Sequence, residues 1–253
     1  PTPQPTPSRS NGTVVSSDIR GTVTCNCRMS GTPDLTLIFN TPGVVEDCSF
    51  HPCVRYARWE REAVVSFVPP DGAFTLMTYR VTERPPPLPV TCRPAVTMRD
   101  GAGRASFTLL TKPMPGVGGG RMAAGGAGSA LVGAGGEGGV EDVRLVVSFP
   151  HAVKAHDLVA DAGSTSVNPR TNALTWSLRH MPRDRSPELA GTVHLAPGAP
   201  VPIESLAATL EFVAPGQTAS GLGVKDLLLV SEKYAFFKGM RSVLKSGRIQ
   251  IRT

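Results

Sequence analysis

The sequence has no long hydrophobic run, no Cys-x-x-Cys motif and few aromatic residues, which make up 6% of its 253 positions. A membrane-spanning helix needs about 20 consecutive apolar residues, so we expect no transmembrane span. The first residues, PTPQPTPSRS, lack the apolar core of a secretory signal. We interpret residues 1–11 as a flexible, proline-rich lead-in.

The five cysteines are an odd number, which does not suit a framework of disulfides. Without an export signal, we expect reduced, buried thiols in a cytosolic protein. A zinc site is the alternative for the group formed by Cys25, Cys27, Cys48, His51 and Cys53. Because cysteine is also a common small core residue, packing is the favoured interpretation, and we expect no metal and no cofactor.

Glycine (27) and proline (24) are abundant, and no segment keeps a helical period over three turns. Apolar and polar residues alternate instead in many short runs separated by turns. These runs lie at 19–29, 35–39, 104–110, 143–149, 172–178, 191–195, 205–213, 224–230 and 248–253. Short strands at this density predict an all-β chain built from sandwiches or barrels.

The stretch VSFVPPDGAFTLMTYRV (65–81) has apolar runs on both sides of Pro-Pro-Asp-Gly. Pro70 has its φ preset for a turn, and Gly72 accepts a positive φ. The stretch therefore predicts two strands joined by a short turn, as in a hairpin.

Two compositional breaks interrupt the strands. ERPPPLP (83–89) is too rich in proline for a central strand, and we interpret it as a stiff crossing between two sheets. Residues 113–140 are rich in glycine and predict a mobile surface loop between two strands. A phosphate-binding role for these glycines requires a helix after the loop, but a strand-like run follows at Val143.

The net charge of +6 is concentrated near the C-terminus, where residues 221–253 contain seven positive and two negative side chains. A basic segment of this kind suits an anionic membrane surface, nucleic acid or an acidic partner. The simpler alternative is a strand face kept soluble by Lys and Arg.

Four stretches, in this order, resemble the C-terminal mu homology domain of clathrin-adaptor medium subunits. They are SGTPDL (30–35), SFHPCVRYARWE (49–60), VSFVPPDGAFTLMTYRV and the basic end SGRIQIRT (246–253). SFHPCVRYARWE and EKYAFFKGMRSVLKSG (232–247) are most similar to the medium subunit of adaptor protein complex 3. The resemblance covers the chain from about Gly12 onward.

The resemblance implies an elongated pair of immunoglobulin-like β-sandwich subdomains, the second inserted into the first. The first, signal-binding subdomain would comprise residues 12–83 and 206–253, and the second residues 84–205. In this family, a membrane-protein tail carrying a Tyr-x-x-Φ signal (Φ is a bulky hydrophobic residue) lies extended along the edge of the first subdomain.

The implied function is cargo recognition for vesicle transport from the Golgi and endosomes to lysosomes or vacuoles. The implied partners are tails of transmembrane cargo, the other subunits of a heterotetrameric adaptor complex and an anionic, phosphoinositide-type membrane surface. Nucleic acid is not an expected partner. We expect a cytoplasmic protein that lies peripherally on Golgi, endosomal and transport-vesicle membranes.

The family's binding residues map onto two pockets and a basic surface. The tyrosine pocket corresponds to Asn26, Lys238, Gly239 and Arg241, and the Φ pocket to Val224, Leu227 and Met240. The membrane-facing residues are Lys225, Lys245, Arg248 and Arg252. A guanidinium can stack on a phenol ring and donate hydrogen bonds at its edge, which suits Arg241.

The sequence departs from the family pattern at three places. Gly239 stands where complexes 1 and 2 have tryptophan, and Asn26 stands where the family has lysine. The family's aromatic-x-Asp strand, whose Asp accepts a hydrogen bond from the signal tyrosine, would precede Pro1. These departures favour an alternative, a coatomer-like or endocytic-adaptor-like scaffold that does not bind tyrosine signals. Arg241 and the three apolar residues of the Φ pocket favour signal binding instead. The simpler interpretation of those three apolar residues is that they belong to the sandwich core.

Two further alternatives are disfavoured. The five histidines are scattered, and none has a nucleophile or a metal-ligand spacing nearby, so we expect no enzymatic activity. An extracellular immunoglobulin-like module is disfavoured by the expectation of reduced thiols.

Overall fold

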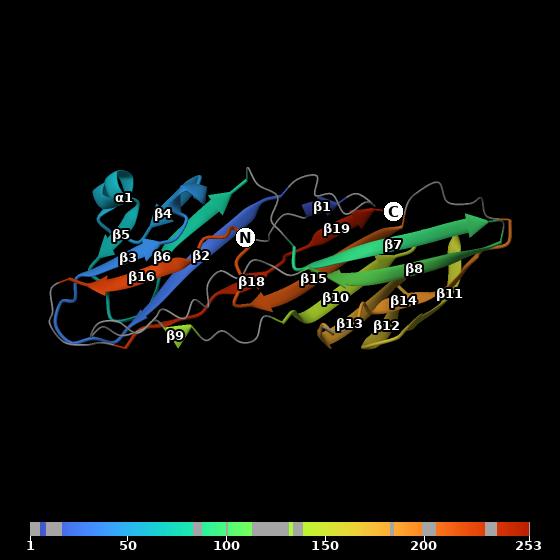
Figure 1. Cartoon of the computed structure of the whole chain (residues 1–253). Helices are drawn as coiled ribbons and strands as arrows, with labels where there is room; N and C mark the ends of the chain where they lie inside the picture. Colours follow the sequence, from blue (N-terminus) through green and yellow to red (C-terminus); the bar gives the residue numbers. More distant parts are fainter. Residues whose placement is uncertain are drawn as a thin grey trace.

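The computed structural model describes residues 6–8, 17–82, 88–99, 101–112, 132–133, 139–182, 185–198, 206–230 and 237–252. The molecule is elongated, with β-sheets at both ends (Figure 1). Regular structure in the described residues is almost entirely β-strand, which confirms the predicted all-β class. None of the helices among these residues is long and apolar enough to span a membrane.

The larger end is built from two sheets that face each other. The first sheet has the order β1 (Thr6–Ser8), β19 (Ile249–Arg252), β15 (Ala207–Pro215), β10 (Glu141–Ser148), β13 (Ala173–His180) and β12 (Ser164–Asn168), and β18 (Val243–Lys245) also pairs with β15. The second has the order β11 (Val153–Ala160), β14 (Glu188–Leu195), β8 (Ala102–Thr111) and β7 (Val90–Arg99). All pairs are antiparallel except β1 with β19.

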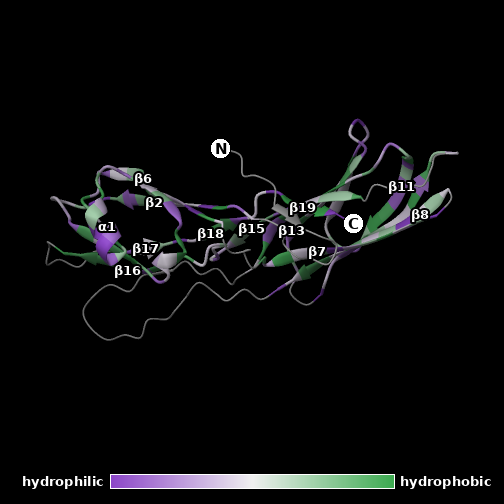
Figure 2. Cartoon of the chain, turned by 90° about the horizontal axis from the view of Figure 1, so that it is seen from above, coloured by the Kyte–Doolittle hydropathy of each residue, from purple (hydrophilic) through white to green (hydrophobic). Residues whose placement is uncertain are grey.

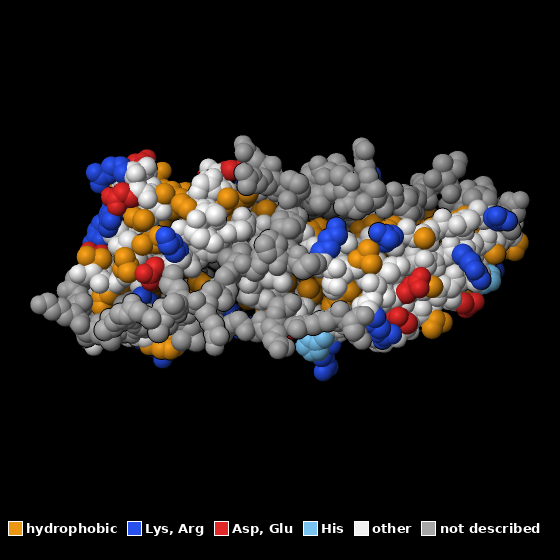
Figure 3. Space-filling model, in the orientation of Figure 1, with side chains coloured by type: hydrophobic (Ala, Val, Ile, Leu, Met, Phe, Trp, Pro, Cys, Tyr) orange, Lys and Arg blue, Asp and Glu red, His pale blue; other side chains and the backbone are white. Residues whose placement is uncertain are grey.

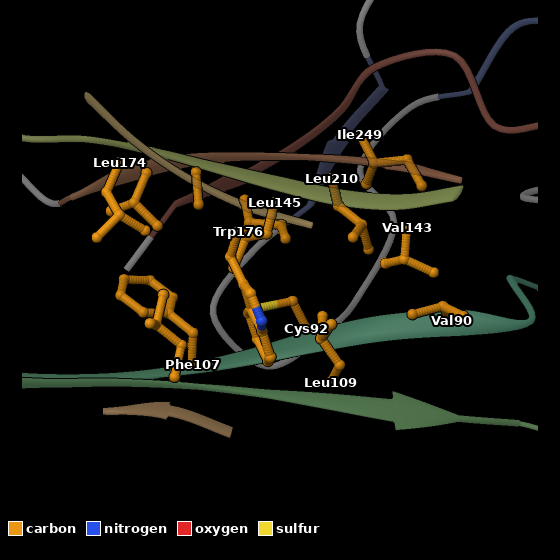
Figure 4. Packing of buried hydrophobic residues seen from close by; sticks show 14 of the residues in the cluster. Val90, Cys92, Phe107, Leu109, Val143, Leu145, Leu174, Trp176, Leu210 and Ile249 are labelled. Carbon is orange, nitrogen blue, oxygen red and sulfur yellow. The ribbon is translucent and has the colours of Figure 1, made fainter. Parts of the chain in front are cut away.

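The core of the larger end lies between these two sheets, because alternate residues of each strand face inward. Val143, Leu145 and Val147 of β10 are at most 1% exposed. Trp176 is fully buried and reaches from β13 toward the strands that carry Cys92 and Phe107 (Figure 4). Its indole N–H donates to the Ala162 carbonyl at 2.7 Å, so the polar atom of this large side chain is satisfied.

The smaller end also contains two sheets. In one, β3 (Leu35–Phe39) lies between β16 (Val224–Leu229) and β5 (Val64–Phe67), and in the other, β6 (Gly72–Val81) lies between β2 (Ile19–Cys27) and β4 (Asp47–Phe50). A 3-10 turn η1 (Pro42–Val44) and a short helix α1 (Tyr56–Glu62) connect strands. The two-residue strand β9 (Val132–Gly133) pairs in parallel with β17 (Gly239–Met240). Figure 2 shows hydrophilic and hydrophobic residues interspersed along the strands of both ends.

The alternation predicted for residues 19–29 is confirmed by the burial of β2. Val23 and Cys25 are partly buried and Cys27 is buried, whereas Thr24 and Asn26 are exposed. One side of β2 is therefore buried or partly buried and the other side is exposed, as period-two alternation requires.

The hairpin interpretation of residues 65–81 is wrong, although both strands and the turn are present. β5 pairs with β3, and β6 pairs with β2 and β4, so the turn carries the chain from one sheet to the other. Gly72 has a φ of 85°, as the turn requires. The short helix α1 was also not expected. It spans only seven residues, too few to show a helical period.

The strand pairing also corrects two boundaries. Thr6–Ser8, within the expected flexible lead-in, pairs with β19, while the rest of that lead-in lies outside the described residues. Residues 206–253 were expected to belong with 12–83. Instead, β15, β18 and β19 join the sheet of the larger end, and β16 alone among the described strands of this range pairs with a strand of the smaller end.

The two compositional breaks lie largely outside the described residues. The proline run 83–89 connects β6 at the smaller end to β7 at the larger end, as a crossing between sheets should, but only residues 88–89 of it are described. The glycine-rich stretch connects β8 to β10, and its described residues include β9. The predicted mobility of that loop is not tested by the structure.

Candidate functional site

A groove with a volume of about 1290 Å³ begins at the smaller end, and we call it the edge groove. It is lined by β2, by β16 and by the C-terminal segment 237–247. Among the described residues, β2 pairs only with β6, and β16 only with β3, so each has a free edge. The smaller sandwich is therefore open here, and the core side chains of Leu35 and Leu37 line the groove.

All seven residues predicted for the two signal pockets line the edge groove: Asn26, Val224, Leu227, Lys238, Gly239, Met240 and Arg241. Asn26 is exposed on the polar face of β2, and Arg241 is exposed just after β17. The two polar groups predicted to meet the signal tyrosine thus come from two segments more than two hundred positions apart.

Val224, Leu227 and Met240 are partly buried rather than sealed in the core. Val224 and Leu227 pack against the buried cluster of the smaller end, which includes Leu37 and Phe39. Each of these two side chains therefore contacts the core on one side and lines the groove on the other. This arrangement can accept a bulky apolar side chain, and its role in binding remains a prediction.

Arg241 and Lys238 differ in how much of their charge is available. Arg241 makes no ion pair with any residue that the structure describes, and its side chain lines the groove. Lys238 is only 9% exposed, and its Nζ lies 3.2 Å from Oδ1 of Asp226 on β16. The predicted tyrosine pocket therefore has one exposed cation, Arg241, and a second cation that is already paired.

Gly239 leaves a gap beside an exposed aromatic ring. A Cβ at this position would lie 3.4 Å from Cε1 of Phe237, and Phe237 is 83% exposed at the groove. Sequence reasoning missed Phe237 as a site residue. The sequence did contain a clue: Phe237 lies two positions before Gly239, which replaces a family tryptophan. The same segment therefore keeps an aromatic side chain.

The strand edge at Gly239–Met240 is occupied by β9 from the glycine-rich stretch, through a parallel ladder of two residues. Sequence reasoning gave no sign of this pairing, because the glycine-rich composition predicted only a loop. A peptide that needs this edge must compete with Val132–Gly133, whereas the free edge of β2 is unoccupied by any described strand.

The predicted membrane-facing residues do not all lie on one element. Lys225 is on β16 at the smaller end, whereas Lys245 and Arg252 are on β18 and β19 of the larger end. Arg248 lies 3.5 Å from Glu211, which offsets part of its charge. On the face shown in Figure 3, Lys and Arg side chains are spread along the molecule rather than gathered in one patch.

The cysteines are all free thiols, and three of them are only partly buried. Burial raises the pKa of Cys25 to about 11, with smaller contributions from the neighbouring Cys53 and Cys27. Because zinc binds thiolates, a raised pKa opposes metal binding. Within the described residues, no group of three or more His, Cys, Asp or Glu side chains could hold a metal ion.

Residues 7–253 match the adaptor complexes medium subunit family. The chain is 36% identical over 244 residues to the AP-3 complex subunit mu of Dictyostelium discoideum, and 33% identical over the same length to the AP-3 complex subunit mu-1 of Homo sapiens. Each match covers 96% of this chain and 54% of the relative. The chain therefore spans about half the length of these curated relatives.

Solved structures with a similar fold include the Fcho1 mu homology domain of Danio rerio with a bound Eps15 peptide. That comparison has a TM-score of 0.61 at 12% identity and covers 98% of this chain and 93% of that chain. The yeast delta-COP-I mu-homology domain has a TM-score of 0.58 at 11% identity and covers 98% and 91% of the two chains. At these identities the likeness shows the fold alone.

The family match and the relatives with more than 30% identity agree over nearly the whole chain. They confirm the resemblance that the four sequence stretches indicated, including its similarity to the medium subunit of complex 3. The chain belongs to the adaptor complexes medium subunit family, a family of adaptor subunits rather than of enzymes.

Proposed function

We propose that the edge groove binds an extended Tyr-x-x-Φ signal in the tail of a membrane protein, and that this binding selects cargo for vesicle transport. The observation that carries the proposal is the convergence of Arg241, Asn26 and the apolar trio Val224, Leu227 and Met240 on one open groove.

The signal tyrosine would be recognised by Arg241. Its exposed guanidinium has no competing ion pair among the described residues, so it is free to stack on the phenol ring and to donate hydrogen bonds. Asn26 is exposed on β2 and offers an amide that can both donate and accept a hydrogen bond. The exposed ring of Phe237 adds an aromatic surface beside Gly239.

The Φ side chain would be buried against Val224, Leu227 and Met240. Complete burial of a large aliphatic side chain contributes about 1.5–3 kcal/mol. The peptide backbone would pair with a free strand edge, and β2 offers one along the groove. Since a short peptide with two anchors must also be ordered on docking, we expect a Kd of roughly micromolar or weaker.

The wider setting follows from family membership and is also a proposal. The chain would act within a heterotetrameric adaptor complex, lying peripherally on Golgi, endosomal and transport-vesicle membranes. Lys225, Lys245, Arg248 and Arg252 are exposed and would contribute to contact with an anionic, phosphoinositide-type surface. Loss of liposome binding after neutralising Lys245, Arg248 and Arg252 together tests this membrane role separately.

The experiment that tests signal binding is a calorimetric titration with a Tyr-x-x-Φ peptide, a Tyr→Ala peptide and the Arg241→Ala variant. We expect measurable binding only for the intact peptide and the unaltered protein. Equal binding of both peptides would show that the tyrosine is not read.

The second candidate function is a scaffold that does not read tyrosine signals. It is favoured by the uncharged Asn26 and by the occupied strand edge at Gly239–Met240. The Fcho1 domain with the similar fold carries a bound Eps15 peptide, and a yeast delta-COP-I domain is complexed with a Dsl1 WxWxV peptide, so other motifs bind to those proteins. Binding of a peptide without tyrosine, unaffected by Arg241→Ala, would support the scaffold.

A further inference from the structure

We propose that Asp226 and Lys238 are a positioning pair that holds the segment 237–241 against β16 and thereby sets the spacing between the tyrosine and Φ pockets. This inference rests on the proposed function of the edge groove. It also changes the role of Lys238, which family resemblance had placed among the residues that contact the signal.

The pair has a rigid acceptor and an enclosed donor. Lys238 Nζ lies 3.2 Å from Asp226 Oδ1, and the same oxygen accepts the backbone N–H of Leu227 at 2.7 Å. The carboxylate is thus anchored to its own strand. The Lys238 side chain is 9% exposed and that of Asp226 is 36% exposed. Lys238 lines the edge groove, but an ammonium this enclosed and bound to Asp226 is better placed to hold the segment than to recognise a peptide.

The pair lies where the two halves of the predicted site meet. On β16, Asp226 stands between Val224 and Leu227, at an irregularity in the pairing with β3. On the other segment, Lys238 is followed closely by Met240 and Arg241, which complete the Φ pocket and supply the exposed cation. Movement of residue 238 relative to residue 226 would therefore separate Met240 from the two β16 residues with which it forms the Φ pocket.

Removal of the two partners should have unequal effects. Asp226→Asn keeps an oxygen for the Leu227 N–H but removes the negative charge that faces the enclosed Lys238 ammonium, which is the costly way to break such a pair. Lys238→Met keeps the apolar stem buried and leaves a carboxylate that is exposed enough to be hydrated. The segment should therefore shift more in the first variant than in the second.

The test is a double-mutant cycle on the affinity for a Tyr-x-x-Φ peptide. Residues in direct contact usually show a measurable coupling energy. We expect the affinity for the peptide to fall about fivefold to tenfold in Asp226→Asn and less than about threefold in Lys238→Met. The double variant should bind like Lys238→Met alone, because the ammonium that interacts with the Asp226 charge is then absent. Lys154, an exposed residue of β11 at the larger end, provides the control: Lys154→Met should bind like the unaltered protein.

A second readout does not require peptide. In the free protein, Asp226→Asn should speed hydrogen exchange at the Met240 amide and move the Met240 methyl resonance, while the resonance of Trp176 stays in place. If the unaltered protein binds no Tyr-x-x-Φ peptide, the proposed function fails, and this readout alone decides on the positioning pair. Three results would overturn the proposed positioning pair. They are unchanged exchange of the Met240 amide in Asp226→Asn, additive losses of affinity in the double-mutant cycle, and an equal loss of affinity in Lys154→Met.

Discussion

The two ends of the molecule differ in how completely their sandwiches are closed. At the larger end, side chains such as Trp176, Phe107 and Leu145 have no exposed surface. At the smaller end, Val65 and Leu76 are as deeply buried, but Leu35 and Leu37 border the edge groove. We therefore expect the larger end to supply more of the stability, whereas the smaller end leaves apolar surface and strand edges available for a ligand.

The largest expected effect comes from removing an aromatic side chain at each end. Trp176→Ala should lower the free energy of unfolding by about 3–5 kcal/mol, since it leaves a large cavity and an unpaired Ala162 carbonyl. Trp59 is only partly buried and makes edge contacts with Phe39 and Phe50, so Trp59→Ala should cost less. Denaturant unfolding of both variants measures the difference, and equal losses would contradict the comparison.

A second pair of variants compares glycines at the two ends. A Cβ on Gly191 would lie 1.9 Å from the Asp157 backbone carbonyl, whereas one on Gly21 would lie 1.9 Å from the Tyr79 ring. A ring can move, at the expense of its 2.9 Å hydrogen bond to Ser220, but a paired strand cannot. Gly191→Ala should therefore destabilise the protein more than Gly21→Ala, which should cost about 1–3 kcal/mol.

The control for the glycine comparison is Gly43→Ala, because nothing lies within 4 Å of a Cβ at that position. Thermal unfolding should show no large change for Gly43→Ala. A greater loss for Gly21→Ala than for Gly191→Ala would show that the larger end is the more adaptable one.

A third prediction concerns access to the groove at the smaller end. Replacing residues 113–138 by a shorter Gly-Ser linker removes β9 and frees the Gly239–Met240 edge. Because the ladder is only two residues long and parallel, the gain in affinity for a Tyr-x-x-Φ peptide should be small, about twofold to fivefold. Calorimetry measures the change, and weaker binding would show that β9 supports the groove instead of blocking it.

The smallest expected effect is a difference in thiol reactivity. Burial raises the pKa of Cys92, at the larger end, to about 12. Burial is also the main cause of the raised pKa of Cys48 at the smaller end, where Asp47 adds to the shift. The thiolate is the reactive form, so a raised pKa lowers the rate of alkylation at pH 8. In the folded protein, mass spectrometry should find Cys92 alkylated more slowly than Cys48, and the reverse order would contradict a closed larger core.

The sequence predicted local structure better than it predicted which strands pair. Alternation placed Asn26 on an exposed face and Cys27 on a buried one, because period two is a local property of a strand. The Pro-Pro-Asp-Gly turn was equally compatible with a hairpin and with a crossing between sheets. Pairing between distant strands, such as β15 with β10, leaves no short-range signal, and the expected boundary at residue 206 was therefore misplaced.

The candidate site shows the same limit. Resemblance assigned Arg241 to a tyrosine pocket and the apolar trio to a Φ pocket, and all four residues line the edge groove. Neither resemblance nor periodicity indicated that Lys238 is paired with Asp226, because the two residues lie on separate segments. The occupation of the Gly239–Met240 edge by β9 was equally invisible, since it depends on contact between segments more than one hundred positions apart.

The account depends on one physical claim, that the open side of the smaller sandwich accepts an extended chain. Hydrogen exchange with and without a saturating Tyr-x-x-Φ peptide tests it most directly. We predict slower exchange along the strands that line the groove, β2, β16 and residues 237–245, with β7, β8 and β14 unchanged. Protection on those larger-end strands, or no protection along β2 and 237–245 at saturation, would contradict the claim.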